Sequence, residues 1–452
     1  MPTDPITCLA APAAWLSDSL RDDSLRDDAL HDDALFVDGA RILSGWQLLV
    51  DGAAPTPASS HRTGASSASF TAACANPSLT ITRRRVAEPM GGTEIITLAN
   101  ASDASITVTV SVLTEPSTSA RIEATPPPSS TSARIEATRP PSSAPARMEA
   151  TPPPSSARME AAPLSASARF EAASPGPAAP LTWTAAVPPR GTWSAEVRIT
   201  RTDIPSIARP KRFSTLRVTA DDARLNALVR AGVQDLDALR RTRGPDAYYS
   251  TSSPTHLTLS PREALWAARL ALPLGHDVAA GTLRLVADLL DAALAPLYAA
   301  TLAEAIRWGM SPDAAPPVSL DLSAFGPPGL RLRAPGVITD LLDAAERHDY
   351  RLPPPADLDP SISSSDRPHA CGAATAPAVL TALLGLDVDV PKGQITFDPL
   401  TPSPVGAFRI RGLKIADGLL DASVTSEGTL TVHNGPLGVT FHNADGSPAR
   451  IA

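Results

Sequence analysis

The sequence predicts a protein of mixed class, with an N-terminal antiparallel β-sandwich, a helical region and a small C-terminal β unit. Three observations predict this architecture. Short β-branched segments separated by turn residues fill the first part of the chain. Apolar residues at helical spacing dominate residues 217–390, and strand-like segments return from Gln394 onward. At 452 residues, the chain has room for two or three domains.

The composition of the chain argues against several classes of function. The net charge of −8 argues against a general nucleic-acid-binding role, which needs clustered positive charge. Three widely spaced cysteines, Cys8, Cys74 and Cys371, predict neither a disulfide framework nor a metal site. No signal peptide or membrane-length apolar run is recognisable. We therefore expect a cytoplasmic protein that has no membrane partner and no cofactor.

The N-terminal residues 1–33 end in a short acidic repeat of the type Leu-Arg-Asp-Asp, copied three times over residues 20–34. A leucine every fifth residue fits neither the helical nor the strand period, so the aspartates would not share one face of a regular element. We interpret residues 1–33 as a disordered acidic tail. Metal ligation by the paired aspartates is the alternative.

The predicted sandwich covers residues 34–114 and 179–204. Its strands alternate partly between apolar and polar residues, and turn sequences such as Glu88-Pro-Met-Gly-Gly separate them. The strands are expected over Arg41–Asp51, Leu79–Ala87, Gly92–Asn100, Ile106–Thr114, Leu181–Val187 and Thr192–Thr202.

Residues 115–178 interrupt the sandwich with a low-complexity insertion. It holds five copies of Ala-Arg-[Ile/Met/Phe]-Glu-Ala, most of them joined by Pro/Ser spacers. One apolar residue per copy buries too little area to offset the entropy of ordering. We interpret the insertion as disordered, with a partner-binding array as the alternative.

The helical region, residues 217–390, begins with an amphipathic pattern over Asp221–Arg243. A second helix start reads Ser260-Pro261-Arg262-Glu263, in which Ser260 is the N-cap, Pro261 lies at N1 and Glu263 completes a capping box. Residues 391–452 form the C-terminal β unit. Further helices are expected over Val278–Ala295, Tyr298–Trp308, Gly336–His348 and Ala376–Leu384.

Several segments of this chain resemble bacterial glycogen-debranching proteins of the amylo-α-1,6-glucosidase kind. Ala34–Gly52 and Thr80–Ala87 are similar to the opening strands of that family, Asp221–Leu228 to its first barrel helix, and Leu265–Leu283 to a later barrel segment. The resemblance implies a β-sandwich followed by an (α/α)6 barrel, and an α-glucan or oligosaccharide as the ligand.

The departures from the family pattern concern its sugar pocket. The family motif Phe-Gly-Arg-Asp is replaced by Ser260–Glu263, and the stretches Lys-Asp-Ser-Gly-Asp-Ser and His-Gly-Gly-Ser-Val-Trp-Pro-His-Asp have no counterpart. About six helices are expected here, where the family barrel has twelve. The sequence therefore predicts an incomplete barrel in a truncated homologue with impaired or absent activity, and no residue is assigned as catalytic.

Three residues are candidates for contact with substrate: Arg262, Glu263 and Tyr249. Glycoside hydrolysis needs two carboxyl groups across the scissile bond, and Glu263 is the acid that replaces the family's own. The alternative is that Glu263 only caps the helix and that Arg262 is only a solvated residue of its first turn. Tyr249 could stack on a sugar ring, whereas Trp266 is expected in the core. Asp340, Asp343 and Glu346 are expected on a solvated helix face.

Three other functions stay open at this point. The chain could be an enzyme with a displaced carboxylate pair, which would place an acid opposite Glu263. It could be a non-catalytic α-glucan-binding or regulatory module, which requires an exposed aromatic platform beside polar groups. It could also be an interaction protein that acts through the repeats of residues 115–178. The sequence leaves the oligomeric state open.

Overall fold

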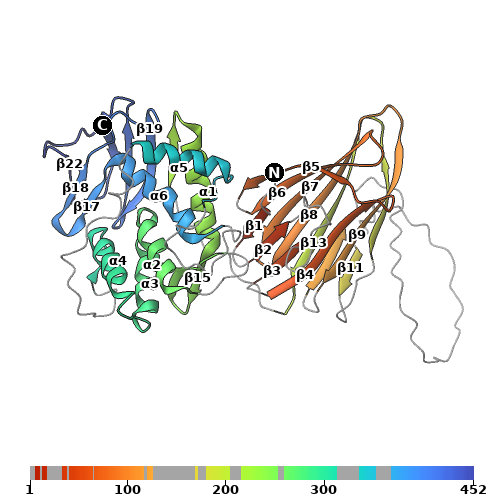
Figure 1. The fold of residues 1–452 in the computed structure, drawn as a ribbon, viewed down its shortest axis with the longest axis horizontal. Helices are drawn as coiled ribbons and strands as arrows, with labels where there is room; N and C mark the ends of the chain where they lie inside the picture. Colours follow the sequence, from red (N-terminus) through yellow and green to blue (C-terminus); the bar gives the residue numbers. More distant parts are fainter. Residues whose placement is uncertain are drawn as a thin grey trace, which may run out of the picture.

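In the computed structural model, two bodies lie side by side: a β-sandwich, and a helical region capped by the C-terminal strands (Figure 1). The structure describes residues 6–10, 13–17, 33–37, 40–64, 66–116, 120–125, 168–171, 180–203, 215–252, 259–312, 335–352 and 368–452.

The sandwich is built from two antiparallel sheets, as the sequence predicts. The six-stranded sheet has the order β1 (Ile6–Ala10), β2 (Ala13–Ser17), β3 (Ala34–Val37), β4 (Ala40–Val50), β9 (Ile106–Pro116), β12 (Leu181–Val187). The seven-stranded sheet has the order β11 (Ala168–Glu171), β10 (Ala120–Thr125), β13 (Thr192–Arg201), β8 (Gly91–Asn100), β7 (Leu79–Glu88), β6 (Ser67–Ala73), β5 (Thr56–Gly64).

Strand alternation explains the core between these sheets. Along β12, every second residue from Leu181 to Val187 is buried, because successive side chains of a strand point to opposite faces. Two tryptophan pairs fill the interior in edge-on geometry: Trp15 with Trp46, and Trp183 with Trp193. Such edge-to-face pairs suit the charge distribution of aromatic rings.

Two predictions of disorder are wrong in part. Residues 1–33 contain β1 and β2, and Cys8 and Trp15 in these strands are fully buried in the sandwich core. Residues 115–178 contain β10 and β11, which are the first and last copies of the Ala-Arg-x-Glu-Ala repeat. A single copy cannot order itself, but the existing edge of β13 supplies the missing hydrogen-bond partners. The acidic repeat and copies two to four lie outside the described residues.

The sequence also gave no signal for the hairpin of β5 and β6. These strands are rich in Ser, Ala and Thr, and most of β5 is exposed. β6 pairs with β7, and β5 pairs with β6, so strand pairing rather than β-propensity decides their conformation.

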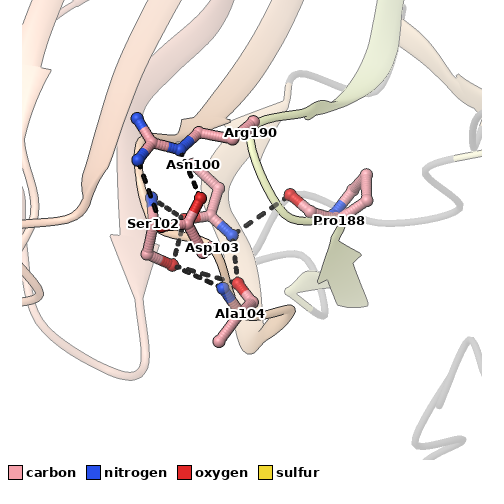
Figure 2. A network of polar contacts seen from close by, with 6 residues as sticks. All are labelled: Asn100, Ser102, Asp103, Ala104, Pro188 and Arg190. Atoms are coloured by element: carbon pink, nitrogen blue, oxygen red, sulfur yellow. Dashed lines mark hydrogen bonds and ion pairs between the residues drawn. The ribbon is translucent and has the colours of Figure 1, made fainter.

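A turn network ties the two sheets together at one end of the sandwich (Figure 2). The Asn100 side-chain amide donates to the backbone oxygens of Ala104 and Pro188, at 2.7 and 3.1 Å, while its carbonyl oxygen accepts from the Ser102 amide. Arg190 forms an exposed ion pair with Asp103 at 2.8 Å. Asn100 thus supplies hydrogen bonds that these turns lack internally.

The helical region has six α-helices within the described residues, in agreement with the number expected. They are α1 (Ala223–Leu239), α2 (Pro261–Leu270), α3 (Asp277–Ala287), α4 (Ala295–Arg307), α5 (Pro335–Arg347) and α6 (Ala370–Leu384). The helix predicted over Val278–Ala295 is shorter, since α3 ends at Ala287. A turn in which Asp291 accepts hydrogen bonds from the amides of Ala293 and Leu294 separates it from α4. The last helix begins before Ala376, with His369 as its N-cap.

Helices α1 and α6 pack closely through Gly232. A Cβ atom at Gly232 would lie 2.5 Å from the Ala376 Cβ and 2.6 Å from the Ala373 carbonyl oxygen. That carbonyl lies four residues before Pro377, which has no N–H to donate to it. The absence of a side chain at Gly232 therefore lets the two backbones approach at this point.

The C-terminal strands share one hydrophobic core with the helices. Strand β14 (Arg217–Ala220) enters the helical region and pairs with β19 (Phe408–Ile415), which continues into β20 (Gly418–Val424) and β21 (Leu430–Asn434). A second small sheet joins β17 (Asp387–Asp389), β18 (Gln394–Phe397) and β22 (Thr440–Asn443), and a two-stranded one joins β15 (Arg240–Arg243) and β16 (Asp246–Tyr249). The boundary expected at residue 391 does not separate two cores. Within the described part of the chain, no helix is long and apolar enough to cross a membrane.

Candidate functional site

Helix α2 begins where the sequence predicts, but without the predicted capping box. Ser260 has the extended backbone of an N-cap, yet its side chain makes no capping hydrogen bond. Glu263 does not fold back onto the Ser260 amide either, because its carboxylate is fully buried on the inner side of α2. The capping interpretation of Glu263 is therefore wrong.

Glu263 faces His369 across the interior of the helical region. The His369 Nε2 lies 3.5 Å from the Glu263 Oε1, and both side chains are 0% exposed. Among the described residues, neither carboxylate oxygen of Glu263 has a hydrogen-bond partner. Removal of an ionised carboxylate from water costs several kcal/mol unless hydrogen bonds replace the lost solvation. Both oxygens of this buried carboxylate therefore lack a described replacement for water.

The start of α6 fixes the orientation of the His369 ring. Its Nδ1 accepts a hydrogen bond from the Cys371 amide at 3.3 Å, as an N-cap side chain does. A ring nitrogen that accepts carries no hydrogen, so in the neutral ring the hydrogen is on Nε2. The Nε2–H therefore points toward Glu263.

Ser252 and Cys371 complete the buried cluster around Glu263. Ser252 bridges to His369 through the backbone, and its fully buried Oγ has no partner among the described residues. The Cys371 Sγ donates to the Glu263 carbonyl oxygen at 3.4 Å. Burial, with a smaller contribution from the Glu263 charge, raises the pKa of the Cys371 thiol. Cys371 is thus held as an unreactive thiol.

Arg262 and Tyr249, the other two predicted contacts, differ in their exposure to solvent. Arg262 is exposed in the first turn of α2. Tyr249 is 1% exposed and belongs to the hydrophobic core, where burial raises the pKa of its hydroxyl. The three predicted contacts therefore do not form one open surface: Arg262 faces solvent, whereas Glu263 and Tyr249 are enclosed.

Trp266 is half-buried against the core, in agreement with the prediction. It lies one helical turn after Arg262, so both residues share one face of α2. The Arg269 guanidinium lies over its ring, 5.9 Å from the ring centroid. Trp266 and Arg262 are thus both accessible to a solute on this face of α2.

The other acidic candidates lie on the surface. Asp340, Asp343 and Glu346 are exposed on α5, and Asp343 pairs with Arg224. This confirms the solvated face that the sequence predicts. No group of three or more His, Cys, Asp or Glu residues in the described ranges is arranged to hold a metal ion.

The sequence reasoning missed a buried charge cluster in the sandwich. Arg85 is fully buried and pairs with Asp33 at 2.5 Å and with Glu94 at 2.7 Å, while Arg83 pairs with the other Glu94 oxygen at 2.6 Å. The Arg85 guanidinium lies 5.0 Å from the ring centroid of Trp15, a favourable cation–π geometry. Burial alone would raise the pKa of Glu94, but the two arginines outweigh it and lower this pKa to about 2.

A second missed cluster joins the two bodies. Arg62 on β5 lies 3.5 Å from Asp235 on α1 and donates to the Asp349 carbonyl oxygen at 2.5 Å. Asp235 is held from the other side by Arg351, through two hydrogen bonds of 2.9 Å. Burial and the neighbouring Arg351 lower the pKa of Arg62. The run Arg83-Arg-Arg in a predicted strand was a usable signal for the first cluster, but no local pattern marks the second.

Comparison with known proteins agrees with the sandwich architecture. Residues 21–115 match the family described as the N-terminal domain of (some) glycogen debranching enzymes. This match confirms, for that segment, the family resemblance found in the sequence. Among solved structures, the chain is similar to a putative kojibiose phosphorylase from the human microbiome, with a TM-score of 0.43 and 6% identity over 95% of this chain and 91% of that chain. No curated protein matches the chain in sequence.

Proposed function

We propose that this protein is a catalytically silent relative of the glycogen-debranching glucosidases. The burial of Glu263 is the observation that carries the proposal. A glycosidase acid must touch the glycosidic oxygen or a water beside the anomeric carbon, and its partner carboxylate lies about 5–9.5 Å away across the bond. Glu263 is 0% exposed, and among the described residues it faces a histidine and not a second acid.

Hydrolysis of branched α-glucans tests the proposal directly. We expect no glucose from a limit dextrin, measured with an enzyme-coupled glucose assay, above the level of the heat-denatured protein. Glucose release by the native chain that disappears in Glu263→Gln would overturn the proposal. Glu346→Gln, on the exposed face of α5, is the matched control for the loss of one negative charge.

The alternative function is non-catalytic binding of an α-glucan. It is supported by the shared α2 face of Arg262 and Trp266, which offers a guanidinium and part of an indole ring one turn apart. Such a pair can donate hydrogen bonds to sugar hydroxyls and stack on a sugar ring. A glucan bound there would need no carboxylate pair.

Thermal unfolding with maltooligosaccharide tests this alternative. A ligand that binds only the folded state raises its stability by RT ln(1 + [L]/Kd). Binding at this face predicts an increase in Tm that Arg262→Ala and Trp266→Phe reduce and that Arg190→Ala leaves unchanged. An unchanged Tm at millimolar oligosaccharide would exclude useful affinity for this ligand.

A further inference from the structure

The four-stranded sheet β14-β19-β20-β21 has an inner face on the core and an outer face away from it. Along β14 and the first half of β19, every second residue packs on the core. Because successive side chains of a strand point to opposite faces, Arg217, Thr219, Arg409 and Arg411 belong to the outer face. The first two and Arg411 are exposed, and Arg409 is half-buried. We call these four residues the arginine block.

The register of β14 and β19 makes the arginine block compact. Arg217 lies directly opposite Arg411, and Thr219 lies directly opposite Arg409. Cβ atoms of directly opposite residues are about 4.5–5.5 Å apart, and residues i and i+2 of one strand are about 6.8 Å apart. Arginine side chains are long and flexible, so three guanidinium groups at these spacings can converge on one small ion.

The positive charges of the arginine block lack an acidic partner among the described residues. Arg217, Arg409 and Arg411 form no ion pair there, and the buried Arg409 Nε has no hydrogen-bond partner. On the neighbouring β20, the Asp421 Oδ1 accepts a hydrogen bond of 2.8 Å from the Gly412 amide. Like charges directly opposite each other destabilise a strand pair. A bound anion would relieve this repulsion.

Hydroxyl groups flank Arg409 on both neighbouring strands. Thr219 lies opposite it on β14, and Ser423 lies opposite it on β20. The His433 Nε2 lies 2.8 Å from the Ser423 Oγ and holds this hydroxyl in place. Guanidinium N–H groups and hydroxyls are hydrogen-bond donors, and a phosphate group offers three strongly accepting oxygens. This set of donors therefore suits a phosphate group.

We propose that the arginine block binds the phosphate group of a small ligand, either free phosphate or a phosphate monoester. The three guanidinium groups donate charge-assisted hydrogen bonds to the phosphate oxygens, and the hydroxyl of Thr219 adds a neutral donor. The net charge of the chain is −8, so attraction of the anion depends on these local charges. This site lies on the outer face of the sheet and is independent of the proposed function.

Isothermal titration calorimetry of the full chain at pH 8 tests the proposal. The probes are inorganic phosphate and glycerol 3-phosphate, and sodium chloride at equal ionic strength is the reference. We expect saturable binding of at least one phosphate probe with a millimolar Kd, and none of chloride. The probe that binds more tightly identifies free phosphate or the monoester as the source. Absence of saturable binding for both probes would overturn the proposal.

Matched arginine variants locate the site. Arg411→Gln should weaken phosphate binding about tenfold, because it removes charge-assisted hydrogen bonds. Arg84→Gln is the control, since it removes the same charge from an exposed strand position in the sandwich and should keep the wild-type affinity. Equal affinities of the two variants would contradict the assigned site.

Thr219→Val separates a shaped site from diffuse attraction of anions. It removes one donor without a change in charge and should weaken binding about threefold. All three substituted side chains are exposed, so each variant should keep the wild-type Tm in the absence of phosphate. Wild-type affinity in Thr219→Val would show that charge alone attracts the anion and would overturn the proposal.

Discussion

Single charged residues show how strongly this chain depends on buried pairs. Glu94 and Arg85 are both fully buried and form an ion pair. Glu94 also pairs with Arg83, and Arg85 also pairs with Asp33. Glu263 is buried equally deeply but, among the described residues, has a charge partner only in the His369 Nε2, 3.5 Å from one oxygen. The difference between a satisfied and an unsatisfied carboxylate leads to opposite expectations for the same Glu→Gln change.

Glu94→Gln is expected to lower stability at neutral pH by about 3–5 kcal/mol, because it removes one partner of a buried ion pair. The folded-state pKa of about 2 lies below the reference value of 4.5. The contribution of Glu94 is therefore complete above about pH 4.5 and is lost as the pH falls toward 2. Urea unfolding at pH 7 and pH 3 measures both effects.

The variant should lose less stability than the wild type between these two pH values. Glu196→Gln, whose side chain is 43% exposed beside Arg198, is the matched control and should stay within about 0.5 kcal/mol of the wild type. An equal pH dependence in Glu94→Gln and the wild type would contradict the assigned pKa direction.

Glu263→Gln is expected to raise stability by about 1–2 kcal/mol, because the amide keeps the shape and removes a poorly solvated charge. The Gln side chain keeps an oxygen facing the His369 Nε2. Chemical denaturation at pH 7 measures the change, with Glu346→Gln as the exposed control. A loss of more than 1 kcal/mol would mean that the carboxylate makes favourable contacts with residues beyond the described ranges.

At the scale of elements, the close approach of α1 and α6 explains a glycine that helix propensity does not favour. Gly232 lies inside α1, where alanine is the better helix former by about 1 kcal/mol. The neighbouring α6 leaves no room for the extra methyl group, because the Ala373 carbonyl and the Ala376 methyl already occupy that space. Packing therefore opposes propensity at this position.

Gly232→Ala is expected to destabilise the protein by about 1–3 kcal/mol, through displacement of α6. Gly336→Ala in α5 is the control, since no atom lies within 4 Å of the added Cβ and the change should be neutral or slightly stabilising. Circular dichroism during thermal unfolding distinguishes the two. A more stable Gly232→Ala variant would show that α1 and α6 are not in close contact in solution.

At the scale of the whole molecule, the two bodies meet through charges as well as apolar contact. Ala14 of the sandwich packs against Ala238 of α1, and Arg62 reaches across to Asp235 and Asp349. Asp235 is already paired with Arg351 inside the helical body. Arg62 therefore links the sandwich to the helical region, and Asp235 keeps an ion pair within the helical region without it.

Arg62→Ala is expected to leave each body folded and to weaken their coupling. Because Asp235 retains Arg351, the change should cost about 1–3 kcal/mol, below the cost of an isolated buried charge. Scanning calorimetry should show two unfolding transitions in the variant. Their midpoint temperatures should lie further apart than in the wild type. Arg190→Ala, in an exposed pair with Asp103, should leave the profile unchanged; identical profiles for Arg62→Ala and the wild type would contradict the coupling.

The sequence by itself determined the order of the architecture. Alternation over Leu181–Val187 predicted a half-buried strand, and the spacing over Asp221–Arg243 predicted α1. Both signals are local, because side-chain direction repeats every 2 residues in a strand and every 3.6 in a helix. The family resemblance in the N-terminal segment was also readable, and the match of residues 21–115 confirms it.

Only the tertiary structure decided which weak segments become ordered and which polar residues face each other. The strands β1, β10 and β11 carry little local signal and depend on neighbouring strands for hydrogen bonds. His369 lies 106 positions after Glu263 in the chain, yet the two side chains meet in the interior. Periodicity predicts which face a residue occupies, but the packing of distant elements determines what that face meets. The same packing encloses Glu263, which the sequence offered as a contact for sugar.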